Sequence, residues 1–170
     1  MKKLFSAMLC LGLCFGMVGC SDDSISDGDS SKTEEKKEEK VYKIGDTLTY
    51  SESDQKMYTF TINSVKATKE RNQFDDSNPE QVVLINYTYE NIGSDDDVFI
   101  DGSLNFTVID EEGNVCETYP IGDKYAKETP KGAKCTLEAA YGLVKKSSKI
   151  KLRFKEPFGS AEANYELEVK

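Results

Sequence analysis

Residues 81–91 read QVVLINYTYEN, a run in which every second side chain is aliphatic or aromatic. The side chains of this repeating face are Val83, Ile85, Tyr87 and Tyr89. Val82 and Leu84 give the opposite face partial apolar cover. Alternation with a period of two is typical of a strand that buries one side against a core. The run therefore predicts a central β-strand with partial cover on its second face.

Short alternating runs of the same kind continue on both sides of this strand, and none keeps a helical period for three turns. They occupy residues 46–50, 57–65, 104–108, 134–143, 149–155 and 164–169, and a further run begins at Val115. Within 57–65 the apolar residues from Tyr58 to Ile62 stand at even positions, and Val65 stands at an odd position. This change at Asn63-Ser64 predicts a β-bulge. Seven or eight short strands with turn signals between them predict an all-β, antiparallel sandwich.

A hairpin is expected around residues 110–114. Leu104, Phe106 and Val108 alternate in the strand before it. Glu112-Gly113-Asn114 supplies turn residues, and Val115 begins the returning strand.

Six segments follow one another along the chain, namely YKIGDTLTY, YTFTINSVKAT, VVLINYTYENIGSD, FTVIDEEGNV, TPKGAKCTLEAAYGL and KIKLRF. In this order they resemble an immunoglobulin-like domain family of unknown function found in lipoproteins of Gram-positive bacteria. The family is at times mislabelled telomeric repeat-binding factor 2, and its fold is similar to that of a mycobacterial secreted immunogenic antigen. The resemblance covers nearly all of residues 41–170 and implies an immunoglobulin-like β-sandwich there. It supplies no catalytic residues.

The first 19 residues have the pattern of a signal peptide, because Lys2 and Lys3 precede an apolar run that ends at Gly19. This run is shorter than the roughly 20 residues that a membrane-spanning helix needs. Residues 17–20, MVGC, resemble the bacterial lipobox, in which the cysteine is lipidated and becomes the mature N-terminus. We therefore expect Cys20 to carry the lipid that anchors the protein to the outer face of the cell membrane.

Residues 20–40 start at Cys20 and contain one aliphatic side chain, Ile25, among Ser, Thr, Asp, Gly, Glu and Lys. Such a segment cannot bury enough apolar area to offset the entropy of ordering its backbone. We expect a disordered tether between the anchor and a single folded domain at residues 41–170.

The composition argues against several kinds of activity. The 170-residue chain has no histidine, so Ser-His-Asp and Cys-His catalysis and histidine-based metal sites are excluded. A net charge of −9 would repel a phosphate backbone, so nucleic acid is not an expected partner. Since no phosphate-binding glycine loop occurs either, we expect a protein that is not an enzyme and that needs no cofactor.

Acidic loops raise calcium binding as an alternative function, because hard cations take six to eight oxygen ligands. The candidate ligands are Asp95, Asp96, Asp97 and Asp101. Their spacing is not that of an EF-hand, and we favour the interpretation that they are solvated acidic loops. We therefore assign no metal site. A second alternative is the substrate-binding lipoprotein of a transporter, although such receptors usually need two lobes.

Cys116 and Cys135 are the thiols of the folded part. In an exported domain they could form a disulfide, which would stabilise the fold by roughly 3 kcal/mol. The alternative to a disulfide is that both cysteines are small buried residues that remain reduced. We favour the disulfide.

The function expected from these features is display of a protein-binding surface at the cell envelope. Sandwich domains often make contact through their end loops. Two loops here place apolar side chains among polar neighbours, namely Phe74 in the first and Tyr119, Ile121 and Tyr125 in the second. These four residues are the predicted partner contacts, with folding back onto the core as the alternative.

Overall fold

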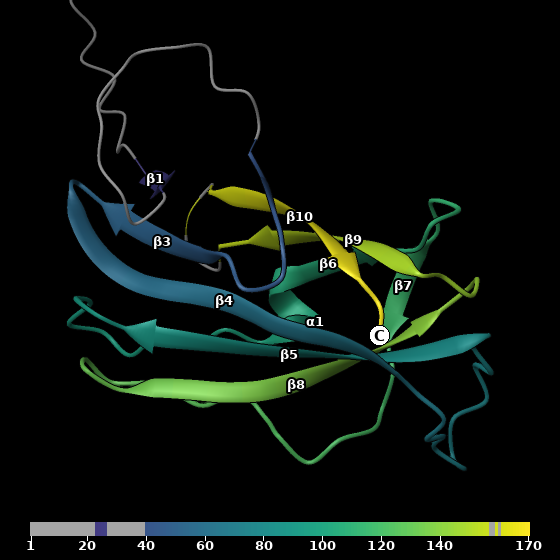
Figure 1. Ribbon diagram of the computed structural model, residues 1–170. Coiled ribbons are helices and arrows are strands. Elements are labelled where there is room, and N and C mark those ends of the chain that lie inside the picture. The colour runs from purple at the N-terminus through teal and green to yellow at the C-terminus, as the bar shows by residue number, and fades with distance from the viewer. Residues whose placement is uncertain (1–22, 27–39, 157–158, 160) are drawn as a thin grey trace, which may run out of the picture.

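The computed structural model describes residues 23–26, 40–156, 159 and 161–170, and of residues 23–26 the backbone only. Within these ranges the chain forms ten strands and one single-turn helix (Figure 1). In chain order the elements are β1 (Asp23–Ser26), β2 (Val41–Tyr42), β3 (Thr47–Glu52), β4 (Gln55–Thr68), β5 (Gln81–Asn91), α1 (Gly102–Asn105), β6 (Phe106–Ile109), β7 (Val115–Thr118), β8 (Lys134–Leu143), β9 (Lys149–Lys155) and β10 (Glu162–Glu168). The seven or eight strands expected from the sequence correspond to β3 to β10, and the short β1 and β2 add to them.

The strands follow one hydrogen-bonded order, β1-β3-β4-β5-β8-β7-β6-β9-β10-β2, which bends into two layers at β7. The first half of β7 pairs with β6, where Cys116 lies opposite Val108. Its second half pairs with β8, where Thr118 lies opposite Tyr141. The first sheet is therefore β1-β3-β4-β5-β8 and the second is β6-β9-β10-β2, with β7 joining them at a corner. Figure 1 shows the long strands β4, β5 and β8 facing β6, β9 and β10.

The core lies between the two sheets and is made by the alternating faces that the sequence predicts. The inward residues of β5, Val83, Ile85, Tyr87 and Tyr89, are fully buried. Phe60 of the first sheet stacks on Phe154 of the second, with ring centroids 4.6 Å apart. Burial of side chains of this size contributes about 1.5–3 kcal/mol each. The predicted antiparallel sandwich is confirmed.

The predicted β-bulge lies at Asn63. Ile62 pairs with Tyr87 and Ser64 with Asn86, so Asn63 has no partner in the ladder. Its side-chain amide instead donates to the Asn86 and Thr88 side chains, 2.8 and 2.9 Å away. The extra residue returns Val65 to the core side, where it is fully buried.

The predicted hairpin at residues 110–114 is present, but the strand before it starts two residues later than expected. Gly113 occupies the turn with a φ of 89°, which glycine adopts without strain. Leu104 does not continue the strand, because residues Gly102–Asn105 form the single turn α1. Asp101 caps this turn by accepting from the N–H of Ser103, and Leu104 is left 77% exposed.

The signal peptide, Cys20 and most of the expected tether lie outside the described residues. Within the tether segment, the backbone of β1 pairs antiparallel with β3, and Ile25 lies opposite Tyr50. Without β1, the outer backbone groups of β3 would form an open sheet edge, which readily accepts another strand.

Candidate interaction surface

The four predicted contact residues divide into two exposed and two buried side chains. Phe74 is 85% exposed in the loop after β4, and Tyr125 is 74% exposed in the connection after β7. Tyr119 is only 5% exposed, and Ile121 is partly buried beside it. Tyr119 and Ile121 thus fold back onto the sandwich, which is the alternative that the sequence left open for them.

Tyr119 and Ile121 cover the outer face of the first sheet. They pack against Val82, Leu84 and Ala140, which point away from the main core. These contacts within the chain therefore explain why the outer face of β5 is partly apolar. The two side chains fix the start of the connection, and Tyr125 lies further along it in solvent.

The two loops are held to each other at their bases. The backbone N–H of Asn72 donates to the Tyr119 hydroxyl at 3.0 Å, and the Asn72 side-chain amide donates to the Pro120 carbonyl at 2.7 Å. We call residues 71–80 and 119–125 the loop surface. It therefore presents Phe74 and Tyr125 from segments with anchored bases.

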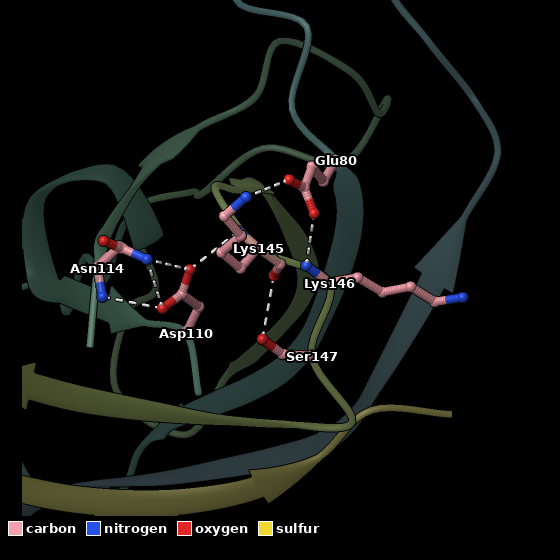
Figure 2. Close-up of polar contacts among 6 residues, drawn as sticks. All are labelled: Glu80, Asp110, Asn114, Lys145, Lys146 and Ser147. Atoms are coloured by element: carbon pink, nitrogen blue, oxygen red, sulfur yellow. Dashed lines mark hydrogen bonds and ion pairs between the residues drawn. The ribbon is translucent and has the colours of Figure 1, made fainter. Parts of the chain in front are cut away.

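A network of polar side chains holds the far end of the first loop (Figure 2). The Lys145 ammonium donates to Glu80 at 2.6 Å, and the N–H of Lys146 donates to the other Glu80 oxygen at 3.3 Å. The N–H of Lys145 also donates to Asp110 at 3.0 Å. The hairpin, the β8–β9 turn and the loop surface are thus linked through one pair of carboxylates.

Asp110 is the buried centre of this network, with 3% of its surface exposed. Burial alone would raise the pKa of Asp110. The Asn114 side chain and the N–H groups of Asn114, Lys145 and Glu112 donate to its carboxylate and together lower that pKa below its ordinary value. The charged form is therefore the one that the fold stabilises.

A groove beside the loop surface was not apparent from the sequence. It has a volume of about 480 Å³, and its walls include Pro79, Tyr119, Val115 and Val144. Val115 is 63% exposed and Val144 47% exposed. Each valine lies next to a turn in the sequence, but only the pairing of β7 with β8 places both at one groove.

The expected disulfide between Cys116 and Cys135 does not form, and both thiols are free. Glu117 pairs with Gly142, so the neighbouring Cys116 lies at the end of β8. Cys135 lies near the other end of β8, opposite Tyr89 of β5. About eight residues of strand, roughly 26 Å, separate the two positions, whereas a disulfide needs Cα atoms within about 7 Å. Burial raises the pKa of the Cys116 thiol.

The four aspartates proposed as calcium ligands do not converge. Asp95 pairs with the Lys131 ammonium at 2.9 Å, and Asp101 caps α1. Asp96 and Asp97 are exposed in the same loop. Among the described residues, no group of three or more acidic, cysteine or histidine side chains could hold a metal ion.

No helix in the described part of the chain has the length and apolar character needed to cross a bilayer.

No protein-family model matches the chain, and no curated protein matches it. Its fold is similar to that of the secreted protein MPT63 from Mycobacterium tuberculosis, with a TM-score of 0.55 and 14% sequence identity over 76% of this chain and 97% of MPT63. It is also similar to the yjhA protein from Bacillus subtilis, with a TM-score of 0.52 and 18% identity over 76% of this chain and all of yjhA. The chain thus contains an immunoglobulin-like β-sandwich, and the expected likeness to a mycobacterial secreted protein is confirmed.

Proposed function

We propose that the protein is a lipid-anchored, extracytoplasmic lipoprotein whose non-enzymatic immunoglobulin-like module binds a protein of the cell envelope. One observation carries the interaction role. Phe74 and Tyr125 remain 85% and 74% exposed although hydrogen bonds from Asn72 to Tyr119 and Pro120 hold the bases of both loops. Large exposed aromatic side chains on positioned loops are typical of binding anchors.

Two further features support the cell-envelope location. Residues 17–20 have the lipobox pattern, and they end an apolar run that begins directly after Lys2 and Lys3. The structurally similar MPT63 is described as a secreted protein. The absence of histidine from the sequence supports a role without acid–base catalysis by histidine.

The anchor is tested with Cys20→Ala. Without the thiol no lipid can be attached, so the variant should appear in the medium or remain as an uncleaved precursor. Membrane fractionation and intact mass measure both outcomes. A processed variant retained in the membrane like the wild type would contradict lipid anchoring at Cys20.

The interaction surface is tested by placing a photoreactive phenylalanine analogue at position 74 or 125 and irradiating intact cells. We expect both positions to yield the same cross-linked envelope protein. Leu104 is the matched control, because it is 77% exposed but lies on α1. Equal products from position 104, or none from positions 74 and 125, would contradict the proposed surface.

Phe74→Ser and Tyr125→Ser separate binding from folding. Because both side chains are exposed, the melting temperature should stay close to that of the wild type. The cross-link formed from the other loop should be lost. A large fall in melting temperature would instead place these side chains in the core.

A further inference from the structure

A cavity opens at the end of the sandwich where the β3–β4 hairpin meets the segment between β5 and α1. Its volume is about 350 Å³, which lies at the lower end of the range of small-molecule sites. Its walls come from three parts of the chain, namely the hairpin, residues 94–100 and Glu156 after β9. The sequence does not mark this cavity, because these parts meet only in the folded sandwich.

One side of the cavity is apolar. Aliphatic or thioether surface comes from Met57 of β4 and from Val98 and Ile100 of the segment between β5 and α1. The Tyr50 and Tyr58 rings stack at a centroid distance of 5.0 Å and also line it. Such walls suit a ligand with an apolar or aromatic body.

The charged side chains that line the cavity are all acidic. Its lining includes Glu52, Asp96, Asp97 and Glu156, and no lysine or arginine occurs among the lining residues that the structure describes. Glu156 is only 4% exposed, and the N–H of Gly159 donates to its carboxylate. Acidic groups around a partly closed site concentrate cations there.

The Tyr58 hydroxyl provides a separate indication of a ligand. Tyr58 is 4% exposed, and its hydroxyl has no hydrogen-bond partner within the described part of the chain. Burial, followed by the charge of Glu156, raises the pKa of Tyr58, so the phenol keeps its proton. Glu156, whose charge acts on this phenol, lines the cavity together with Tyr50 and Tyr58. Unpartnered buried hydroxyls are uncommon because they cost stability.

We propose that this cavity binds a small organic cation, in which an ammonium group lies toward Glu156 and Tyr58 and an apolar body packs on Met57, Val98 and Ile100. The ammonium N–H groups donate to the Glu156 carboxylate and to the Tyr58 oxygen. The tyrosine rings add the attraction of a cation for an aromatic face. This binding requires neither the lipid anchor nor the envelope partner, so it extends beyond the proposed function.

The first experiment uses the chain from residue 20 with Cys20→Ala, which keeps every described residue. The probe is 2-phenylethylammonium, and the controls are the anion 3-phenylpropionate and neutral 2-phenylethanol. Binding is followed by amide NMR shifts at residues 57, 58 and 96–100. We expect the cation to bind at least about tenfold more tightly than the anion. Equal binding of the anion would overturn the proposal, as would the absence of shifts up to about 10 mM with both this cation and the lysine derivative described next.

A lysine side chain presents the same ammonium chemistry on a partner protein. Nα-acetyl-lysine methylamide is therefore titrated in parallel. Tighter binding of 2-phenylethylammonium identifies a free amine as the ligand class, and tighter binding of the lysine derivative identifies a protein-borne one. Failure of both probes overturns the proposal.

Two tyrosine variants test the role of the Tyr58 hydroxyl. Tyr165 is the matched control, because its hydroxyl is also buried without a partner in the described chain but its ring does not line the cavity. Tyr58→Phe and Tyr165→Phe should both keep or raise the melting temperature. Only Tyr58→Phe should weaken cation binding, by about three- to tenfold.

The double variant Asp96→Asn/Asp97→Asn tests the charge of the rim without changing buried groups. Both carboxylates are exposed, so the melting temperature should be unchanged. Cation binding should weaken by about threefold or more and should depend less on salt. Wild-type affinity in both this variant and Tyr58→Phe would overturn the proposal.

Discussion

The hydroxyl of Tyr119 accepts a hydrogen bond from the backbone N–H of Asn72 across 47 positions of the sequence, at 3.0 Å. The phenol ring is buried against the outer face of the first sheet, whereas its oxygen reaches the base of a loop from another part of the chain. One side chain thus covers the sheet and positions the loop surface.

Tyr119→Phe should keep the fold and loosen the loop. The ring still covers Val82 and Ala140, but the Asn72 N–H loses its acceptor. We expect the free energy of unfolding to fall by about 1 kcal/mol. Hydrogen exchange should become faster in residues 71–80 and stay unchanged in β5. Unchanged exchange in the loop would show that its position does not depend on this bond.

Asp110 should make stability fall in acid. Its folded-state pKa is depressed by the donors from Asn114, Lys145 and Glu112, so its stabilising contribution is fully present above the unfolded pKa, about 4. The contribution is lost as the pH falls through the lower folded-state pKa. Wild-type melting temperature should therefore decrease below about pH 4.

Asp110→Asn should reduce stability at neutral pH by about 1–3 kcal/mol, because a neutral amide replaces an acceptor of several hydrogen bonds. The decrease in acid should be smaller than in the wild type. Asp123→Asn is the control, since Asp123 is exposed. An identical acid profile for wild type and Asp110→Asn would contradict the assigned role.

The two thiols should remain free in air-oxidised protein. Intact mass of the folded domain should be the same with and without reductant, and the melting temperature should not change. Under native conditions, alkylation should be slow at Cys116, which is 5% exposed, and faster at the less buried Cys135. A mass lower by two hydrogens would show that a bridge forms.

Deletion of Asn63 should be far more damaging than Asn63→Ala. The deletion removes the bulge residue and moves either Ile62 or Val65 off the core face of β4. Displacing one such buried side chain should cost about 2–5 kcal/mol, as measured by denaturant unfolding. Asn63→Ala keeps the residue count and loses only the contacts to Asn86 and Thr88. Equal stability of the two variants would contradict this role of the bulge.

Local pattern carried most of the information about the strands. The alternation through Val83, Ile85, Tyr87 and Tyr89 reports which face is buried, because a pleated strand sends successive side chains to opposite sides. The shift of the apolar residues from even to odd positions after Asn63 indicates the bulge for the same reason. Leu104 also fits an alternating pattern, yet the Asp101 cap and the hydrogen bonds of Gly102 with the Tyr87 and Tyr141 hydroxyls hold that segment in a helical turn.

The candidate sites depended on pairings between distant segments. The sequence by itself determined the apolar face of each strand and singled out Phe74 and Tyr125 as apolar side chains in polar loops. Only the tertiary structure decided that Tyr119 and Ile121 cover the sheet and that the register of β7 on β8 keeps Cys116 away from Cys135. It also brought Glu156 to the cavity beside Tyr58. The physical reason is that alternation is set by neighbouring residues, whereas register and cavity walls depend on which distant segments lie side by side.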